Sequence, residues 1–159
     1  MSDTRHDPVR GSGATPVEGP LGRLVVVFDN HIARALVTIA EAAGWSAALL
    51  EEAPTDPESL GHVDALVVCN HDGAGAYDLI ADAATSGVRY VAMMASRGRS
   101  ASVLEDFRSR GMTDEALGRL HLPAGLSIGG SSAGEIALSV MAEVVADAHG
   151  RPGGPMRGH

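Results

Sequence analysis

The chain has 159 residues, of which 45% are hydrophobic and 20% are charged, as in ordinary soluble domains. Its formal net charge of −8 excludes a nucleic-acid or anionic-membrane surface, because both need a basic face. No apolar run approaches the roughly 20 residues that cross a bilayer, and the single cysteine, Cys69, allows no internal disulfide. We therefore expect a cytoplasmic protein with one domain.

Both ends of the chain are rich in Gly and Pro and poor in large apolar side chains. Such segments bury too little apolar surface to offset the entropy lost on ordering. We therefore predict disordered tails at residues 1–22 and 150–159, on either side of a single domain at residues 23–149.

Strand and helix patterns alternate along that domain. Continuous apolar runs predict buried strands, and apolar stripes at helical spacing predict helices that end at residues such as Gly44. Thr113 is the expected N-cap of one helix, and Ser132 with Glu135 forms the capping box of the last helix. The predicted strands are 24–28, 45–50, 65–69, 89–94 and a short 125–128; the predicted helices are 31–43, 74–86, 99–110, 113–120 and 133–149.

This alternation predicts an α/β fold, a doubly wound parallel sheet of the Rossmann-like kind with helices on both faces. Ligands of such folds bind beyond the carboxyl ends of the strands. The candidate binding residues are therefore those that follow the predicted strands and lead into the helices: Asp29, Asn30, His31, Glu51, Asn70, His71, Asp72, Ser96, Arg97, Gly129, Gly130, Ser131 and Ser132.

The turn after the first strand lacks the glycines that a dinucleotide site uses. That site normally reads G-x-G-x-x-G, so that backbone N–H groups approach a pyrophosphate. Here the turn reads Asp29-Asn30-His31-Ile32-Ala33, and the carboxylate of Asp29 would repel a diphosphate. Either the ligand differs from a classical dinucleotide, or Asp29 or Asn30 simply caps the first helix.

The other candidate positions also allow two interpretations. Arg97, after Ser96, would hold a phosphate or a carboxylate, or would make a surface salt bridge. The segment 129–132 is either an anion site at a helix N-terminus or an ordinary turn with a cap. Glu51 lies where an acidic residue would bind a ribose hydroxyl.

Catalytic and metal-binding patterns are not evident. No residues form a clear acid–base or nucleophile–base pair, and Cys69 reads as an inert buried thiol. His31, His71 and Asp72 have side chains that suit a divalent metal, but no close ligand pair such as H-x-x-x-H is present. We therefore expect neither catalytic residues nor a metal site.

Several segments together resemble the C-terminal Rossmann-like domain of the XdhC/CoxI family. The most specific one covers residues 120–144 and reads LHLPAGLSIGGSSAGEIALSVMAEV, similar to the family's His-x-Pro-x-Gly-Leu and Ser-rich turn. Ser96-Arg97 matches the family's Gly-Ser-Arg, with Ala95 in place of glycine. Asn70-His71-Asp72 matches its Thr-His-Asp, with Asn70 in place of threonine. The resemblance covers residues 23–146.

The chain departs from the family pattern in two places. The family's first turn reads G-x-G-H-x-G, of which only His31 is kept, and its N-terminal domain, which carries a cysteine motif implicated in handling the molybdenum cofactor, has no counterpart here. The resemblance implies a non-enzymatic accessory protein that assists the maturation of molybdenum hydroxylases such as xanthine and carbon monoxide dehydrogenases.

The same resemblance implies a molybdenum hydroxylase or its maturation proteins as partners, and the molybdenum cofactor or a nucleotide as ligand. Two alternatives stay open. One is an NAD(P)-binding oxidoreductase with a degenerate phosphate turn, and the other is a homodimerising scaffold domain without a ligand.

Overall fold

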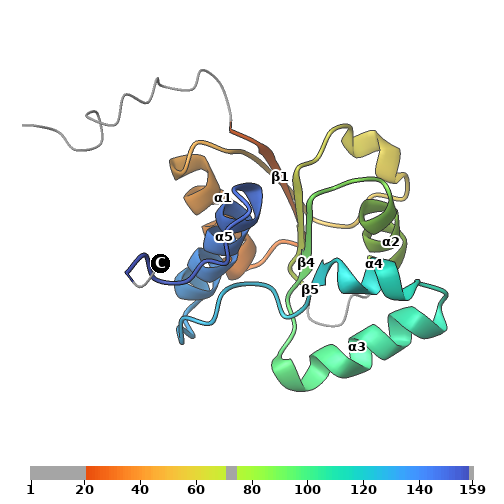
Figure 1. Cartoon of the computed structure of the whole chain (residues 1–159). Helices are drawn as coiled ribbons and strands as arrows, with labels where there is room; N and C mark the ends of the chain where they lie inside the picture. Colours follow the sequence, from red (N-terminus) through yellow and green to blue (C-terminus); the bar gives the residue numbers. More distant parts are fainter. Residues whose placement is uncertain (1–20, 71–74, 158–159) are drawn as a thin grey trace, which may run out of the picture.

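The computed structural model describes residues 21–70 and 75–157 (Figure 1). Strands and helices alternate along these residues, as the sequence predicts. The strands are β1 (Arg23–Val27), β2 (Ser46–Leu50), β3 (Ala65–Val68), β4 (Tyr90–Met93) and β5 (Leu120–His121). The helices are α1 (His31–Ala42), the 3-10 helix η2 (Pro57–Leu60), α2 (Tyr77–Thr85), α3 (Arg97–Ser109), α4 (Asp114–Gly118) and α5 (Ala133–Ala148).

The five strands form one parallel sheet in the order β2-β1-β3-β4-β5. Val27 pairs with Leu50 of β2 and with Val68 of β3, and Val68 pairs with Met93 of β4. Because these pairs lie at the ends of four strands, the strands finish at the same level. Their following residues, 28–30, 51–52, 69–70 and 94–97, form what we call the carboxyl edge. The predicted α/β fold class is confirmed.

Helices cover both faces of the sheet (Figure 1). Successive side chains of β1 point to opposite faces, as the pleat requires. Leu24 and Val26 are buried in the cluster that includes residues of α1 and α5. Val25 and Val27 are buried in the cluster that includes residues of α2, α3 and α4. The near-continuous apolar sequence of the inner strands follows from this two-sided burial.

The predicted strand at 125–128 is wrong. The fifth strand is instead Leu120–His121, which pairs with Val91 and Ala92 of β4 and lies where the sequence predicted the end of a helix. Gly125 takes a φ of +102°, which strand residues do not adopt. The Leu126 N–H donates to the carbonyl of Ser139 at 3.2 Å, so this segment bonds to α5 and not to the sheet.

The predicted tails fall partly within the described chain. Residues 1–20 and 158–159 lie outside the described residues, and both tail boundaries stay predictions. After α5, the N–H groups of Gly150 and Arg151 donate to carbonyls of Asp147 and Ala146 at 3.0 and 2.8 Å. Gly153 lies beside the side chain of Leu126. Among the described helices, none combines the length and the apolar character that crossing a membrane requires.

Candidate functional site

The chain leaves β1 through a residue in a conformation that glycine usually takes. Phe28 has a φ of +76°, and its N–H donates to the carbonyl of Leu50 at 2.8 Å. A residue other than glycine with a positive φ is strained by on the order of 1–3 kcal/mol, and it keeps this conformation only where the surrounding contacts hold it. The half-buried ring packs against the apolar cluster shared with α2 and α3. The tight turn therefore forms without a glycine at this position.

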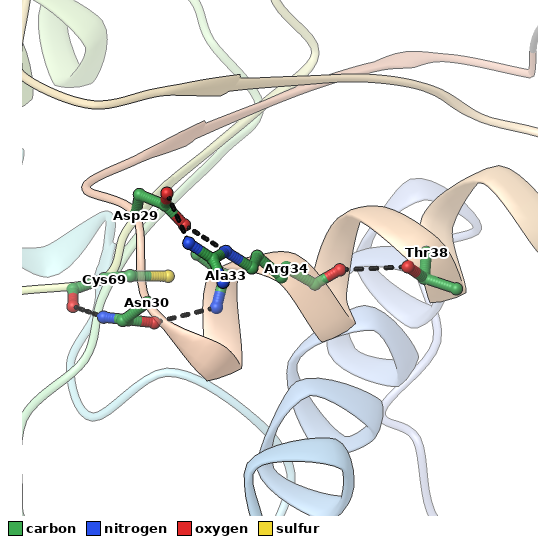
Figure 2. A network of polar contacts seen from close by, with 6 residues as sticks. All are labelled: Asp29, Asn30, Ala33, Arg34, Thr38 and Cys69. Atoms are coloured by element: carbon green, nitrogen blue, oxygen red, sulfur yellow. Dashed lines mark hydrogen bonds and ion pairs between the residues drawn. The ribbon is translucent and has the colours of Figure 1, made fainter.

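Asn30 closes the N-terminus of α1 with its own side chain (Figure 2). Its Oδ1 accepts the Ala33 N–H at 2.9 Å, and its Nδ2 donates to the carbonyl of Cys69 at 2.8 Å. The capping interpretation is confirmed for this residue. The amide also ties the turn after β1 to the end of β3, and it occupies an N–H group that a dinucleotide site would offer to a phosphate.

Asp29 is paired with an arginine one turn into the helix. Arg34 donates from Nε and Nη2 to the two carboxylate oxygens at 2.7 and 3.0 Å, as Figure 2 shows. The hydrogen bond from Arg34 holds the pKa of the Asp29 carboxyl below its usual value. The carboxylate is thus ionised, but its charge is balanced locally. The repulsion of a diphosphate expected from the sequence is correspondingly weaker.

The other candidate residues after the first three strands differ in exposure. His31 is the exposed first residue of α1, and Glu51 is exposed in the bend after β2. Asn70 is half-buried directly after β3, whereas His71 and Asp72 lie outside the described residues. Within the described chain, no three His, Cys, Asp or Glu side chains gather as metal ligands would.

Cys69 lies at the end of β3 between the sheet and its helices. It is 6% exposed, and burial raises the pKa of its thiol to about 12. A thiol with so high a pKa is almost fully protonated at neutral pH and is a poor nucleophile. The predicted burial of this thiol is confirmed.

Ser96 and Arg97 follow β4 and begin α3. Ser96 is the N-cap, with its Oγ accepting the Arg99 N–H at 3.2 Å. Arg97 is exposed, and its Nη2 lies 3.4 Å from the Oγ of Ser127, a contact at the long end of hydrogen bonding. In the described part of the chain, the guanidinium of Arg97 has no ion-pair partner. Of the candidate residues, Arg97 offers the positive charge that an anionic ligand needs.

The segment 129–132 already holds an anion that belongs to the chain. Ser132 caps α5, and Oε1 of Glu135 accepts from the N–H and the Oγ of Ser132 at 3.3 and 2.9 Å. The hydroxyl of Ser132 and the backbone N–H groups of Ser132 and Ser131 keep the pKa of Glu135 below its usual value. The predicted capping box is confirmed, and a carboxylate of α5 occupies the place an external anion would take.

One partly buried group of contacts was not predicted from the sequence. Oε1 of Glu143 accepts from the Tyr90 hydroxyl at 2.6 Å and from the Gly125 N–H at 3.1 Å, and lies 3.2 Å from Nδ1 of His121. The Tyr90 and His121 rings stack with centroids 4.4 Å apart. Glu143 was the available signal, because it is a carboxylate in the middle of a helix whose neighbouring residues are mostly apolar.

Two cavities lie away from the carboxyl edge. A cavity of about 370 Å³ opens at the amino ends of β3 and β4, where Trp45, Arg89 and Asp147 contribute to its lining. A more open groove of about 850 Å³ is lined by residues of α1 and α5, with Leu138 and Met156 at its surface.

Known proteins match the chain over almost the whole of this fold. Residues 24–144 match the family model described as the XdhC Rossmann domain. The uncharacterized protein YqeB of Escherichia coli (strain K12) is 27% identical, over 88% of this chain and 30% of its own length. A Bacillus halodurans protein whose crystal structure is described as that of a xanthine dehydrogenase is similar in fold. Its TM-score is 0.62 at 20% identity, covering 82% of this chain and 43% of its own.

The chain thus spans less than half the length of either relative. The family model, in contrast, is matched by most of the 159 residues and by every strand of the sheet. The chain belongs to the XdhC Rossmann domain family.

Proposed function

We propose that this chain is a non-enzymatic accessory protein of a molybdenum hydroxylase, of the xanthine or carbon monoxide dehydrogenase type, and that it assists the maturation of that enzyme or the handling of its molybdenum cofactor. The match to the XdhC Rossmann domain over residues 24–144 carries this proposal. Such work takes place in the cytoplasm, where a lone reduced thiol such as Cys69 persists.

One of the polar side chains at the carboxyl edge, that of Arg97, supports a binding role. Asp29 pairs with Arg34, and Asn30 and Ser96 cap helices, so these groups fix the turns in place. Arg97 is exposed beside the loop that leads to α5, and its charge suits a phosphate or another anionic group of a cofactor. We therefore place ligand contact at Arg97 and not at the N-terminus of α1.

The test is the activity of the host's molybdenum hydroxylases after deletion of the gene for this chain. We expect enzyme protein that is present but deficient in activity and in bound molybdenum, with both restored by the wild-type chain. The Arg97→Ala variant should restore less hydroxylase activity than the wild-type chain. The control variant Arg157→Ala, at an exposed arginine near the C-terminus, should restore the activity fully. Unchanged hydroxylase activity in the deletion strain would refute the proposal.

A second candidate function, a homodimerising scaffold, has one observation in its favour. Leu138 and Met156 border the apolar groove of α5 and are 50% and 93% exposed. Large exposed apolar side chains at a groove are typical of association surfaces. Sedimentation of the wild type and of a Leu138→Lys variant tests it: a dimer that the substitution dissociates supports this function, and a wild-type monomer contradicts it.

A further inference from the structure

The segment between β5 and α5, residues 122–131, is held to α5 by the carboxylate of Glu143 and by a backbone hydrogen bond. We call this segment the closing loop. Figure 1 shows the chain crossing here from β5 to the start of α5. The Gly125 N–H donates to Glu143 at 3.1 Å, and the Leu126 N–H donates to the carbonyl of Ser139 at 3.2 Å. Farther on, Ser127 lies 3.4 Å from Arg97.

Gly125 allows the loop to approach the helix this closely. Its φ of +102° is open to glycine but strained for other residues. A Cβ at this position would lie 2.5 Å from Oγ of Ser139. The backbone N–H of residue 125 therefore reaches Oε1 of Glu143 because no side chain separates the loop from α5.

Three groups converge on that single oxygen. Besides Gly125, the Tyr90 hydroxyl donates to it, and Nδ1 of His121 lies 3.2 Å away. The Glu143 side chain is 18% exposed and that of His121 is 30% exposed, so water screens their interaction only in part. Tyr90 of β4, His121 of β5 and Gly125 of the loop are in this way all connected to α5.

We propose that Glu143, His121 and Tyr90 form a latch that holds the closing loop against α5, and that loss of the proton from His121 loosens it. An imidazolium carries hydrogen on both ring nitrogens and always donates from Nδ1. A neutral imidazole carries one hydrogen, which occupies either nitrogen. Deprotonation therefore removes the positive charge of His121. It also allows a tautomer without hydrogen on Nδ1, which cannot donate to Glu143.

The charges around His121 favour its protonated form. The groups that act on its ring are Glu143 and Asp147 of α5 and the stacked Tyr90 phenol of β4. The hydrogen bond to Glu143 raises the pKa of His121 above its usual 6.5, and burial opposes this only in part. Burial and the bond to Glu143 raise the pKa of Tyr90, so its hydroxyl stays a donor at physiological pH.

The sign of the pH effect follows from linkage. A histidine whose pKa is raised in the latched state contributes its full stabilisation below pH 6.5 and loses it as the pH rises through the raised pKa. Each unit by which that pKa exceeds its value in the opened state increases the opening equilibrium of the loop by about tenfold.

Amide hydrogen exchange between pH 5.5 and 8.5 tests the latch in the full chain. After correction for intrinsic rates, the protection of the Gly125 and Leu126 amides should fall as the pH rises, while amides of α3 on the opposite face keep theirs. In parallel, nuclear magnetic resonance titration of His121 should give a pKa above that of a model histidine.

Two variants separate the latch from a purely structural contact. His121→Phe keeps an aromatic ring beside Tyr90 but has no proton to lose, so its loop protection should not vary with pH. His149→Gln removes an exposed histidine near the end of α5 and should leave the wild-type profile intact. Loop protection that is independent of pH in the wild type, or equally dependent on pH in His121→Phe, would overturn the proposal.

Discussion

At the residue scale, side chains of the first turn occupy positions that a bound phosphate would otherwise use. Oδ1 of Asn30 accepts a hydrogen bond from the Ala33 N–H, and the guanidinium of Arg34 neutralises the carboxylate of Asp29. These contacts are local in sequence, so the cap at Asn30 could be predicted from residue type and position alone. The ion pair between Arg34 and Asp29 was not predicted, because a carboxylate before a helix can either cap the helix or pair with a side chain within it.

Replacing the cap at Asn30 should destabilise the protein. Asn30→Ala removes the acceptor for the Ala33 N–H and the donor to the Cys69 carbonyl, and we expect a loss of about 1–2 kcal/mol, at the upper end for an N-cap. Asn30→Ser keeps a capping oxygen but is too short to reach Cys69, and should lose less. Urea unfolding curves measure both. Equal stability of Asn30→Ala and the wild type would contradict the role given to the cap.

Gly125 should tolerate alanine less well than a glycine of similar conformation. Gly125→Ala adds a Cβ 2.5 Å from Oγ of Ser139 and keeps the positive φ, whereas Gly111→Ala has a φ of +106° with open space around it. We expect about 1–2 kcal/mol of destabilisation at Gly111 from the backbone alone, and a further 1–3 kcal/mol or so at Gly125 from overpacking. Thermal and urea unfolding compare the two, and equal losses would mean that α5 yields to the added methyl group.

At the scale of elements, prediction succeeded where the deciding contacts are close in sequence. The alternation of apolar runs and stripes located four strands and the main helices, and Ser132 with Glu135 marked the start of α5. The fifth strand was misplaced because two residues carry no periodicity and because Leu120 looks like the end of a helix. Its position depends on pairing with Val91 and Ala92, which are far away in the sequence.

The latch escaped prediction for the same reason. Tyr90 and Glu143 are separated by 53 residues, and Gly125 and Glu143 by 18. The resemblance to the XdhC/CoxI family places His121 and Gly125 in one motif, but it does not show that both contact the same carboxylate. A polar residue on the buried side of α5 was the signal, and only the packing of that helix on the sheet identifies its partners.

The contribution of the capping box to the stability of α5 can be tested by substitution of Ser132. Ser132→Ala removes the oxygen that accepts the Glu135 N–H at 3.1 Å, and we expect a loss of roughly 1 kcal/mol in the free energy of unfolding. Ser131→Ala, at the neighbouring exposed serine, should change stability little. Guanidinium unfolding followed by circular dichroism distinguishes them, and identical midpoints for the two variants would argue against the box.

At the scale of the whole molecule, the two halves of the sheet depend on different kinds of contact. β1 to β4 are joined by continuous ladders, and the residues of β3 and β4 and nearly all of those of β1 are buried, whereas the edge strand β2 is partly exposed. β5, the closing loop and α5 are joined through Glu143 and a few backbone bonds. We therefore expect the pH dependence of global stability to arise in good part from this second region.

Acid should reveal the contribution of Glu143. Burial raises its pKa, but hydrogen bonds from His121, Tyr90 and Gly125 outweigh burial, and the pKa lies below the usual 4.5. A lowered pKa gives stability that is present above pH 4.5 and is lost as the pH falls through the folded-state value. The advantage of the wild type over Glu143→Gln should therefore shrink on acidification, as urea midpoints between pH 3 and 7 would show. A constant advantage would mean that the charge of Glu143 contributes nothing.

The left-handed backbone at Phe28 has a consequence for how this domain can change over generations. Glycine would adopt that conformation without strain, so Phe28→Gly would give the turn the residue type that dinucleotide-binding turns use. The substitution would destabilise the apolar cluster between the sheet and α2 and α3, because that cluster would lose the aromatic ring of Phe28. Laboratory selection for nucleotide affinity, begun from Phe28→Gly, should therefore recover binding through few further changes, with Asn30 among the first to be replaced.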